Sequence, residues 1–373
     1  MTLALALATL FISFLAPPLY SGAVLALFGF VVAQRGLNVS NPLPGGSGAL
    51  VSVFLVFAGL AVLGPSFNHG VSGQNVDAFK FLFAAAALLL GMMLGVEEGG
   101  VRRVLPLLLV AITLYYAGLY FTDAEMSQES LVYPPDNNHS ASMLAVFLPL
   151  VVLRMDGGMR IACLALLLAF SFFSASRSLM ALTLVAGALS SQTIRRQRLL
   201  MVLVLVLAGA VLFYRGFSMD NFSDRLRLQI VEASLSYAQT RGAYAFNFGE
   251  AAFADYLNIY PVYQRLEIQH AHNLLLQIWV AYGIVPFIVF NVFLVGYAVQ
   301  AWRQRNLLAL SAFAIFMALG MLEAIITDIR AFGTIVFALG YFYSRGASLV
   351  TGDSMFSLRE APQQASVAGA ARQ

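Results

Sequence analysis

Residues 274–299 read LLLQIWVAYGIVPFIVFNVFLVGYAV, an uncharged apolar run interrupted only by isolated amide side chains. A helix of about 20 apolar residues can cross the roughly 30 Å hydrocarbon core of a bilayer. Similar runs recur along the chain, in which 60% of residues are hydrophobic and 10% are charged. A soluble domain has about 25% charged residues. The sequence therefore predicts an all-α polytopic membrane protein.

The apolar runs divide into about twelve predicted membrane spans, which form a single transmembrane domain over residues 1–350. The N-terminal run lacks a basic region and a clear cleavage site, so we expect a retained first span rather than a signal peptide. The pair 159–173 and 177–190 is either two spans or one long broken helix. The predicted spans are 3–16, 19–33, 48–64, 78–96, 103–121, 141–154, 159–173, 177–190, 198–214, 272–300, 306–324 and 331–345.

Arginines follow a regular pattern between these spans. Loops after even-numbered spans carry them, whereas loops after the first, third and fifth spans carry none. Because cytoplasmic loops are enriched in Lys and Arg, the pattern predicts that both termini lie in the cytoplasm, with a disordered tail at 351–373. The net charge of +3 is then explained by the arginines of the cytoplasmic loops. It therefore gives no reason to predict a nucleic-acid partner.

The loop 215–271, inserted between spans 9 and 10, departs from this pattern. It is predicted to face outward, yet it is rich in arginine, and Arg177 and Arg330 also fall on the outer side. Since the guanidinium group suits phosphate oxygens, we expect an anionic partner there. The arginines of the loop are Arg215, Arg225, Arg227, Arg241 and Arg265.

Part of this loop has the period of an amphipathic helix. The stretch SDRLRLQIVEASLSYAQ, residues 223–239, places Leu226, Ile230, Ala233 and Tyr237 at helical spacing. The sequence therefore predicts a helix in the outer loop with one apolar face.

Two histidines, His270 and His272, stand directly before the run 274–299. They are a metal pair, polar residues at a membrane surface, or part of a catalytic site. A zinc site needs three or four protein ligands, and His69 and His139 lie in other loops without ligand spacing. We therefore predict no metal site, and leave the other two interpretations open on local grounds.

The segment HAHNLLLQIWVAYGIVPFIVF resembles the signature region of the O-antigen ligase and O-antigen polymerase superfamily, which are bacterial membrane glycosyltransferases. In that pattern a His followed by Asn, Ser or Gln is separated by nine residues from a Gly. His272, Asn273 and Gly283 fit it. The family often has Gly, Thr or Tyr three residues after that Gly, where this chain has Pro286.

Two further features strengthen the resemblance, which extends over roughly residues 140–300. An arginine after a serine at the outer end of a helix is matched by Ser176 and Arg177. An arginine that opens an amphipathic helix before the His motif is matched by Arg225 or Arg227. The resemblance implies a GT-C-like fold in the bacterial inner membrane with a helical periplasmic loop.

The resemblance also implies an inverting glycosyl transfer at the periplasmic face, with no cofactor. The donor would be a glycan linked to undecaprenyl pyrophosphate. The acceptor would be lipid A–core in a ligase, toward which we lean, or a second lipid-linked glycan in a polymerase. The rival class is a lipid or solute transporter, which would carry charges near the bilayer midplane and inverted repeats.

Roles for the candidate residues follow from this chemistry. Arg177 and Arg225 would stabilise the pyrophosphate leaving group, in place of a divalent metal. His272 would be the general base, since its ordinary pKa is near 6.5. The predicted substrate-binding residues are His270, Arg227, Asn273, Arg241 and Arg265.

A few other polar residues have two interpretations each. Glu323, Asp328 and Arg330 form an internal ion pair or belong to the substrate site. Lys80 meets lipid headgroups or a phosphate. His139, near the end of the acidic loop, belongs to a turn or contacts sugar.

Overall fold

The computed structural model describes Ile12 and residues 17–35, 47–69, 80–94, 100–122, 137–190, 222–241, 244–259, 270–321 and 323–351. Within these ranges all regular structure is helical, which confirms the all-α prediction. The predicted span 3–16, apart from Ile12, lies outside the described residues, as do the predicted span 198–214, Arg215 and the tail from 352 onward.

The helices follow the apolar runs closely. In chain order they are α2 (Pro17–Arg35), α3 (Ser47–His69), α4 (Lys80–Leu94), α5 (Gly100–Thr122), α6 (Asn137–Ala145), α7 (Leu148–Arg154), α8 (Gly157–Phe173), α9 (Arg177–Ser190), α12 (Phe222–Arg241), α13 (Glu250–Leu257), α15 (Leu274–Tyr282), α16 (Ile284–Arg303), α17 (Leu307–Gly320), the 3-10 turn η2 (Ile325–Thr327) and α18 (Ile329–Thr351).

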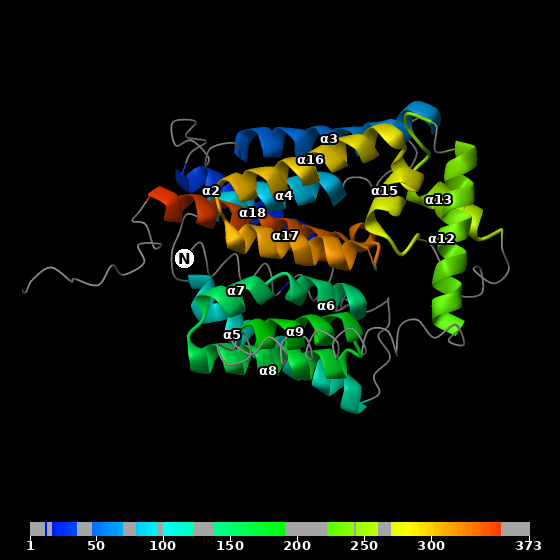
Figure 1. The fold of residues 1–373 in the computed structure, drawn as a ribbon. Helices are drawn as coiled ribbons and strands as arrows, with labels where there is room; N and C mark the ends of the chain where they lie inside the picture. The colour runs from blue at the N-terminus through cyan, green and yellow to red at the C-terminus, as the bar shows by residue number, and fades with distance from the viewer. Residues whose placement is uncertain are drawn as a thin grey trace, which may run out of the picture.

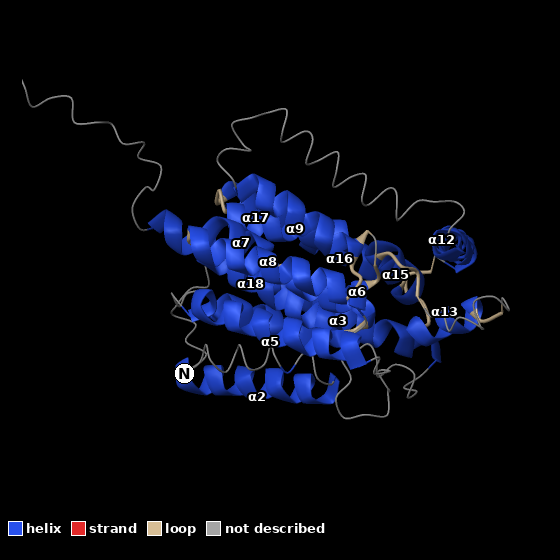
Figure 2. Ribbon diagram, turned by 90° about the horizontal axis from the view of Figure 1, so that it is seen from below, coloured by secondary structure: helices blue, strands red, loops and turns tan. Residues whose placement is uncertain are grey.

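Most of these helices run along a common direction in two groups (Figure 1). Helices α2, α3, α4, α16, α17 and α18 form one group, and α5 to α9 form the other. Helix α12 lies across one end of this bundle, where it packs on α13 and α15, and it is seen end-on when the view is turned (Figure 2). We call this end, where His270 and His272 lie, the histidine end.

Two predicted spans are wrong as single helices. The range 141–154 is divided into α6 and α7 because Pro149 has no N–H and its ring excludes a continuing helix before it. The range 272–300 is divided into α15 and α16 at Gly283, whose φ is 99°. By contrast, 159–173 and 177–190 are two separate helices that pack on each other, joined by a tight turn at Ala175 with φ 51°.

The tightest packing in the bundle is between α4 and α18, and it depends on two glycines. A Cβ atom on Gly91 would overlap the carbonyl oxygen of Phe337, and one on Gly340 would overlap that of Leu88. The two backbones therefore touch, as small residues permit in membrane helices. Ser344 adds a hydrogen bond across the pair, from its Oγ to the Met92 carbonyl at 2.7 Å.

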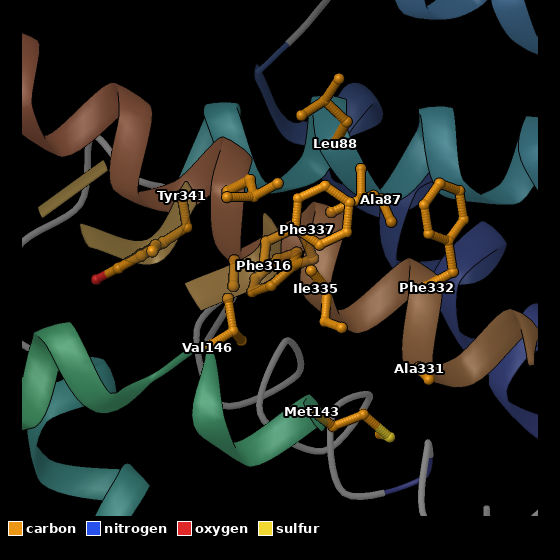
Figure 3. Packing of buried hydrophobic residues seen from close by; sticks show 14 of the residues in the cluster. Ala87, Leu88, Met143, Val146, Phe316, Ala331, Phe332, Ile335, Phe337 and Tyr341 are labelled. Carbon is orange, nitrogen blue, oxygen red and sulfur yellow. The ribbon is translucent and has the colours of Figure 1, made fainter. Parts of the chain in front are cut away.

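The two groups of helices share one apolar core. Figure 3 shows Phe337 of α18 between Leu88 of α4 and Phe316 of α17, with Val146 from the break between α6 and α7 beside Phe316. The break after α6 therefore places apolar side chains of the second group into the core of the first.

Apolar stripes also cover the outside of the bundle. Helix α5 exposes Leu107, Leu114 and Phe121, each seven residues apart. Helix α16 exposes a longer stripe at alternating spacings of four and three: Ile288, Val292, Val295, Val299 and Trp302. Helices apolar on both their inner and outer faces suit a lipid surrounding.

Two described helices are long and apolar enough to cross a membrane by themselves, Ser47–Pro65 within α3 and Ile284–Arg303. Seven shorter apolar helices of 10–17 residues accompany them. These helices are consistent with a helical membrane protein, while the number of twelve spans stays a prediction.

The glycine contact between α4 and α18 is testable by adding one methyl group. Gly91→Ala and Gly340→Ala should each lower the apparent melting temperature of the purified protein in detergent, because overpacking of this kind costs about 1–3 kcal/mol or more. Gly118→Ala is the matched control, since nothing lies within 4 Å of its Cβ position on α5. Equal melting temperatures for the three variants would show that the two backbones are not in contact.

Candidate active site

The segment His270–Asn273 forms the entrance to α15 and has an unusual backbone. His272 has φ 50°, in the left-handed region that residues other than glycine rarely adopt. Such a conformation costs on the order of 1 kcal/mol or more and is frequent at functional sites. The residue that the sequence predicts as the base is therefore held in a strained position.

His272 lies beside a carboxylate from another part of the chain. Its Nδ1 is 3.4 Å from Oε2 of Glu323, and the two side chains are 23% and 10% exposed. Glu323 follows α17, and its backbone N–H donates to the Leu319 carbonyl at 2.9 Å. A carboxylate that accepts from Nδ1 leaves Nε2 as the nitrogen able to take a proton. Sequence reasoning named Glu323 but did not pair it with His272, since 51 residues separate them.

Asn273 fixes this arrangement through its own side chain. Its Oδ1 accepts from the N–H of Leu276 at 2.9 Å, so that it is the N-cap of α15. Its Nδ2 donates to the carbonyl of Met321 at 3.3 Å. The residue predicted to bind substrate thus has a structural role, which holds the start of α15 against the end of α17.

His270 is partly buried and lies next to His272. Its ring centroid lies 4.9 Å from that of His272. Burial, and then electrostatic interaction with His272, His139 and Lys80, lower the pKa of His270 to about 4, although Glu323 opposes the shift. His270 is therefore neutral near pH 7 and suits hydrogen bonding better than ion pairing.

His139 joins the same group, which sequence reasoning did not foresee. It is buried in the first turn of α6 and acts electrostatically on both His270 and Asp328. The one sequence signal for its role was its position, just before the predicted span 141–154 on the outer side.

Asp328 and Arg330 form an internal ion pair, one of the two interpretations given to them. Arg330 Nη2 donates to Asp328 Oδ2 at 2.7 Å and Nε to Oδ1 at 3.1 Å, and Arg330 is 1% exposed. Oδ1 also accepts the Arg330 N–H at 2.7 Å at the start of α18. Burial would raise the pKa of Asp328, but the hydrogen bonds and charge of Arg330 outweigh it and lower that pKa.

Lys80 also has a carboxylate partner. Its Nζ lies 2.6 Å from Oε2 of Glu250, the first residue of α13. Lys80 is buried, so the predicted contact with lipid headgroups is wrong. Glu250 was missed by sequence reasoning, although an acidic residue directly after Gly249 is a signal of a helix N-terminus.

Glycine is required at position 283 of the motif both by its positive φ and by the close approach of another chain segment. A Cβ atom there would lie 2.8 Å from the Ala245 carbonyl oxygen and 2.9 Å from the Asn247 nitrogen. The chain segment 244–249 passes directly over it and bonds to both helices. The N–H groups of Asn247 and Gly249 donate to Tyr282 and Ala281 of α15, and those of Ile284 and Val285 of α16 donate to Tyr244 and Ala245.

Pro286, the departure from the family pattern, fits this geometry. It lies in the first turn of α16, where a backbone N–H has no partner within the helix. A proline at position 286 therefore removes no hydrogen bond from α16.

The predicted amphipathic helix is confirmed as α12. Ile230, Ala233 and Tyr237 are buried and Leu226 is partly buried. Its arginines Arg225, Arg227 and Arg241 have side chains outside the described part of the structure, and Arg265 lies outside the described residues entirely. Their roles stay predictions.

Arg177 opens α9 at the histidine end, and its side chain is exposed. The buried Ser176 before it accepts the N–H of Leu179 at 3.5 Å. Whether Arg177 reaches a pyrophosphate stays a prediction. Among the described residues, no three His, Cys, Asp or Glu side chains are placed to hold a metal ion.

Residues 162–291 match a family model described as O-antigen ligase. The matched segment contains Arg177, helix α12 and the motif from His272 to Gly283. It confirms the resemblance to the O-antigen ligase and polymerase superfamily. No curated protein matches the chain.

The burial of His270 predicts a pH dependence of stability. Its pKa is about 4 when folded and 6.5 when exposed, so the unfolded chain binds more protons between these values. Stability from this residue is therefore lost as pH falls from about 6.5 to 4, by about 2 kcal/mol at pH 5. The fall in apparent melting temperature between pH 7 and pH 5 should be smaller in His270→Gln than in the wild type. An equal fall in both proteins would contradict the burial of a neutral His270.

Proposed function

We propose that the protein is a metal-independent inverting glycosyltransferase that moves a glycan from undecaprenyl pyrophosphate to a sugar hydroxyl, as an O-antigen ligase acting on lipid A–core. The observation that carries the proposal is the pair of His272 and Glu323, 3.4 Å apart, with His272 in the segment matched by the family model. In this proposal the protein spans the bacterial inner membrane about twelve times, with both termini in the cytoplasm and residues 215–271 in the periplasm.

His272 is the proposed general base. The hydroxyl oxygen of the acceptor sugar attacks the anomeric carbon of the donor and gives its proton to Nε2 of His272. Glu323 accepts from Nδ1–H, which fixes the tautomer and stabilises the imidazolium that forms. The strained backbone at His272 and the N-cap of Asn273 hold the ring in this orientation.

The leaving group is undecaprenyl pyrophosphate. The bond between the anomeric carbon and the phosphate oxygen breaks, and its electron pair leaves with the pyrophosphate. Attack from the opposite face inverts the anomeric centre. Arg177 and Arg225, with Arg227 as the alternative to Arg225, are the proposed stabilisers of the negative charge. The residues proposed to contact the glycans are His270, Arg241, Arg265 and Asn273.

The matched family model supports glycosyl transfer of the O-antigen ligase or polymerase type, and the arginine-rich loop, which suits a phosphorylated core acceptor, is the reason for proposing a ligase. Both enzymes use the same donor, and only the acceptor differs. Reconstitution of the protein with undecaprenyl-pyrophosphate glycan, offered either lipid A–core or a second donor molecule, distinguishes them. Sugar gained by lipid A–core supports the ligase, sugar gained by the second donor supports the polymerase, and the absence of any glycosidic product favours the transporter class.

The base and its carboxylate can be tested separately. His272→Ala should lower kcat by about 10²–10⁴-fold, the usual contribution of a general base, while donor binding is retained. Glu323→Gln should lower kcat less and leave the donor KM near its wild-type value, because the amide still contacts the ring but stabilises the imidazolium poorly. Glu232→Gln on the exposed side of α12 is the matched control and should be neutral. Full activity of the His272 variant would rule out proton transfer by this residue.

A further inference from the structure

Helices α12, α13 and α15 have a small core of their own, distinct from the core of the bundle. Within it, the ring of Tyr237 on α12 lies 5.3 Å from that of Phe253 on α13. The core consists of Ile230, Ala233, Tyr237, Ala238, Phe253, Leu257, Ala271 and Val280. We call α12, α13 and α15 the three-helix unit. Helix α15 belongs to both cores, because its Leu274, Ile278, Ala281 and Tyr282 pack in the core of the bundle.

The first two residues of α4 connect this unit to the bundle. Lys80 Nζ lies 2.6 Å from Glu250 Oε2 of α13, and the side chains are only 6% and 14% exposed. The next residue, Phe81, packs its ring edge-on against Tyr282 at the end of α15, with centroids 5.1 Å apart. Neighbouring residues of α4 thus contact α13, which follows segment 244–249, and α15, to which this segment is hydrogen-bonded.

The ion pair between Lys80 and Glu250 is largely shielded from water. Lys80 is the only lysine of the chain and opens a helix that is otherwise apolar. The other carboxylate oxygen of Glu250, Oε1, is buried and makes no hydrogen bond within the part of the chain that the structure describes. Loss of either partner would leave a buried charge without compensation, which is far costlier than loss of a surface pair.

We infer that Lys80 and Glu250 are positioning residues that hold the three-helix unit, and with it the arginine-bearing α12, in place over the histidine end. The inference rests on the proposed function, since it assigns the pair to the placement of the lipid-pyrophosphate donor. Neither residue transfers the proton, which belongs to His272 and Glu323. The pair therefore acts through α12, on donor binding and on the leaving-group stabilisation assigned to Arg225, while proton transfer stays with His272 and Glu323.

The first test compares donor KM and kcat in proteoliposomes that contain the full chain. Lys80→Met and Glu250→Gln should each raise the KM for undecaprenyl-pyrophosphate glycan by about tenfold or more, while the pH profile of kcat, which reports the proton transfer, stays near wild type. The exchanged pair, Lys80→Glu with Glu250→Lys, should restore KM at least in part. Glu232→Gln is the control for removal of a carboxylate.

Two outcomes would overturn the inference. If Lys80→Met is severe, Glu250→Gln is mild and the exchanged pair is not restored, Lys80 binds the donor phosphate directly. If the single variants change the pH profile of kcat while KM stays at the wild-type value, the pair acts on the proton transfer.

The second test reads the position of the unit without any activity. The N–H groups of Asn247 and Gly249 donate to α15 at 3.0 and 2.8 Å, next to Glu250. Their hydrogen–deuterium exchange should be faster in each single variant and slower again in the exchanged pair, while amides in the middle of α5 stay unchanged. Unchanged exchange in the single variants would refute the positioning role. If the wild type makes no glycosidic product but this exchange pattern holds, the proposed function fails and the positioning of the unit stands.

Discussion

The break between α15 and α16 is the constraint on which the histidine end depends. A helix interrupted among apolar neighbours leaves carbonyl and N–H groups that need partners, since each unpaired buried group costs several kcal/mol in an apolar surrounding. Segment 244–249 supplies these partners on both sides of Gly283. The side chain of Asn247 adds a hydrogen bond to the Val280 carbonyl at 2.9 Å. One short segment therefore completes two helix ends at once.

The position of the histidines follows from this break. Because α15 and α16 do not form one straight helix, the N-terminus of α15 can lie against the end of α17. There Asn273 contacts Met321, and His272 lies beside Glu323. Gly320 permits the approach, since a Cβ atom there would lie 2.8 Å from Leu274. A straight helix from 272 to 300 would have no such turn, and its first residues would follow the axis of α16 instead.

The sequence predicted what depends on local pattern. The apolar runs located the helices, and the spacing of Ile230, Ala233 and Tyr237 identified the buried face of α12, because both signals are periodic. The break at Gly283 was missed since the glycine was taken only as part of a motif, and Pro286 was taken as a departure. The pairs His272–Glu323 and Lys80–Glu250 join residues 51 and 170 positions apart. No local rule gives such contacts, which depend on how the helices pack.

The charges at the histidine end are arranged so that the buried acids have basic neighbours. Glu250 has Lys80, Asp328 has Arg330, and Glu323 lies beside His272. Each pair joins two different elements or closes the start of a helix, so each of these basic side chains has an acid of the protein as its neighbour. The pyrophosphate of the proposed donor carries about two negative charges, and its stabilisation is assigned to arginines on other elements. In the proposed function these arginines are Arg177, which opens α9, and Arg225 of α12. In the proposed function the acids at this end of the bundle are therefore compensated within the protein, and the charge of a lipid-linked donor falls to arginines on α9 and on the three-helix unit.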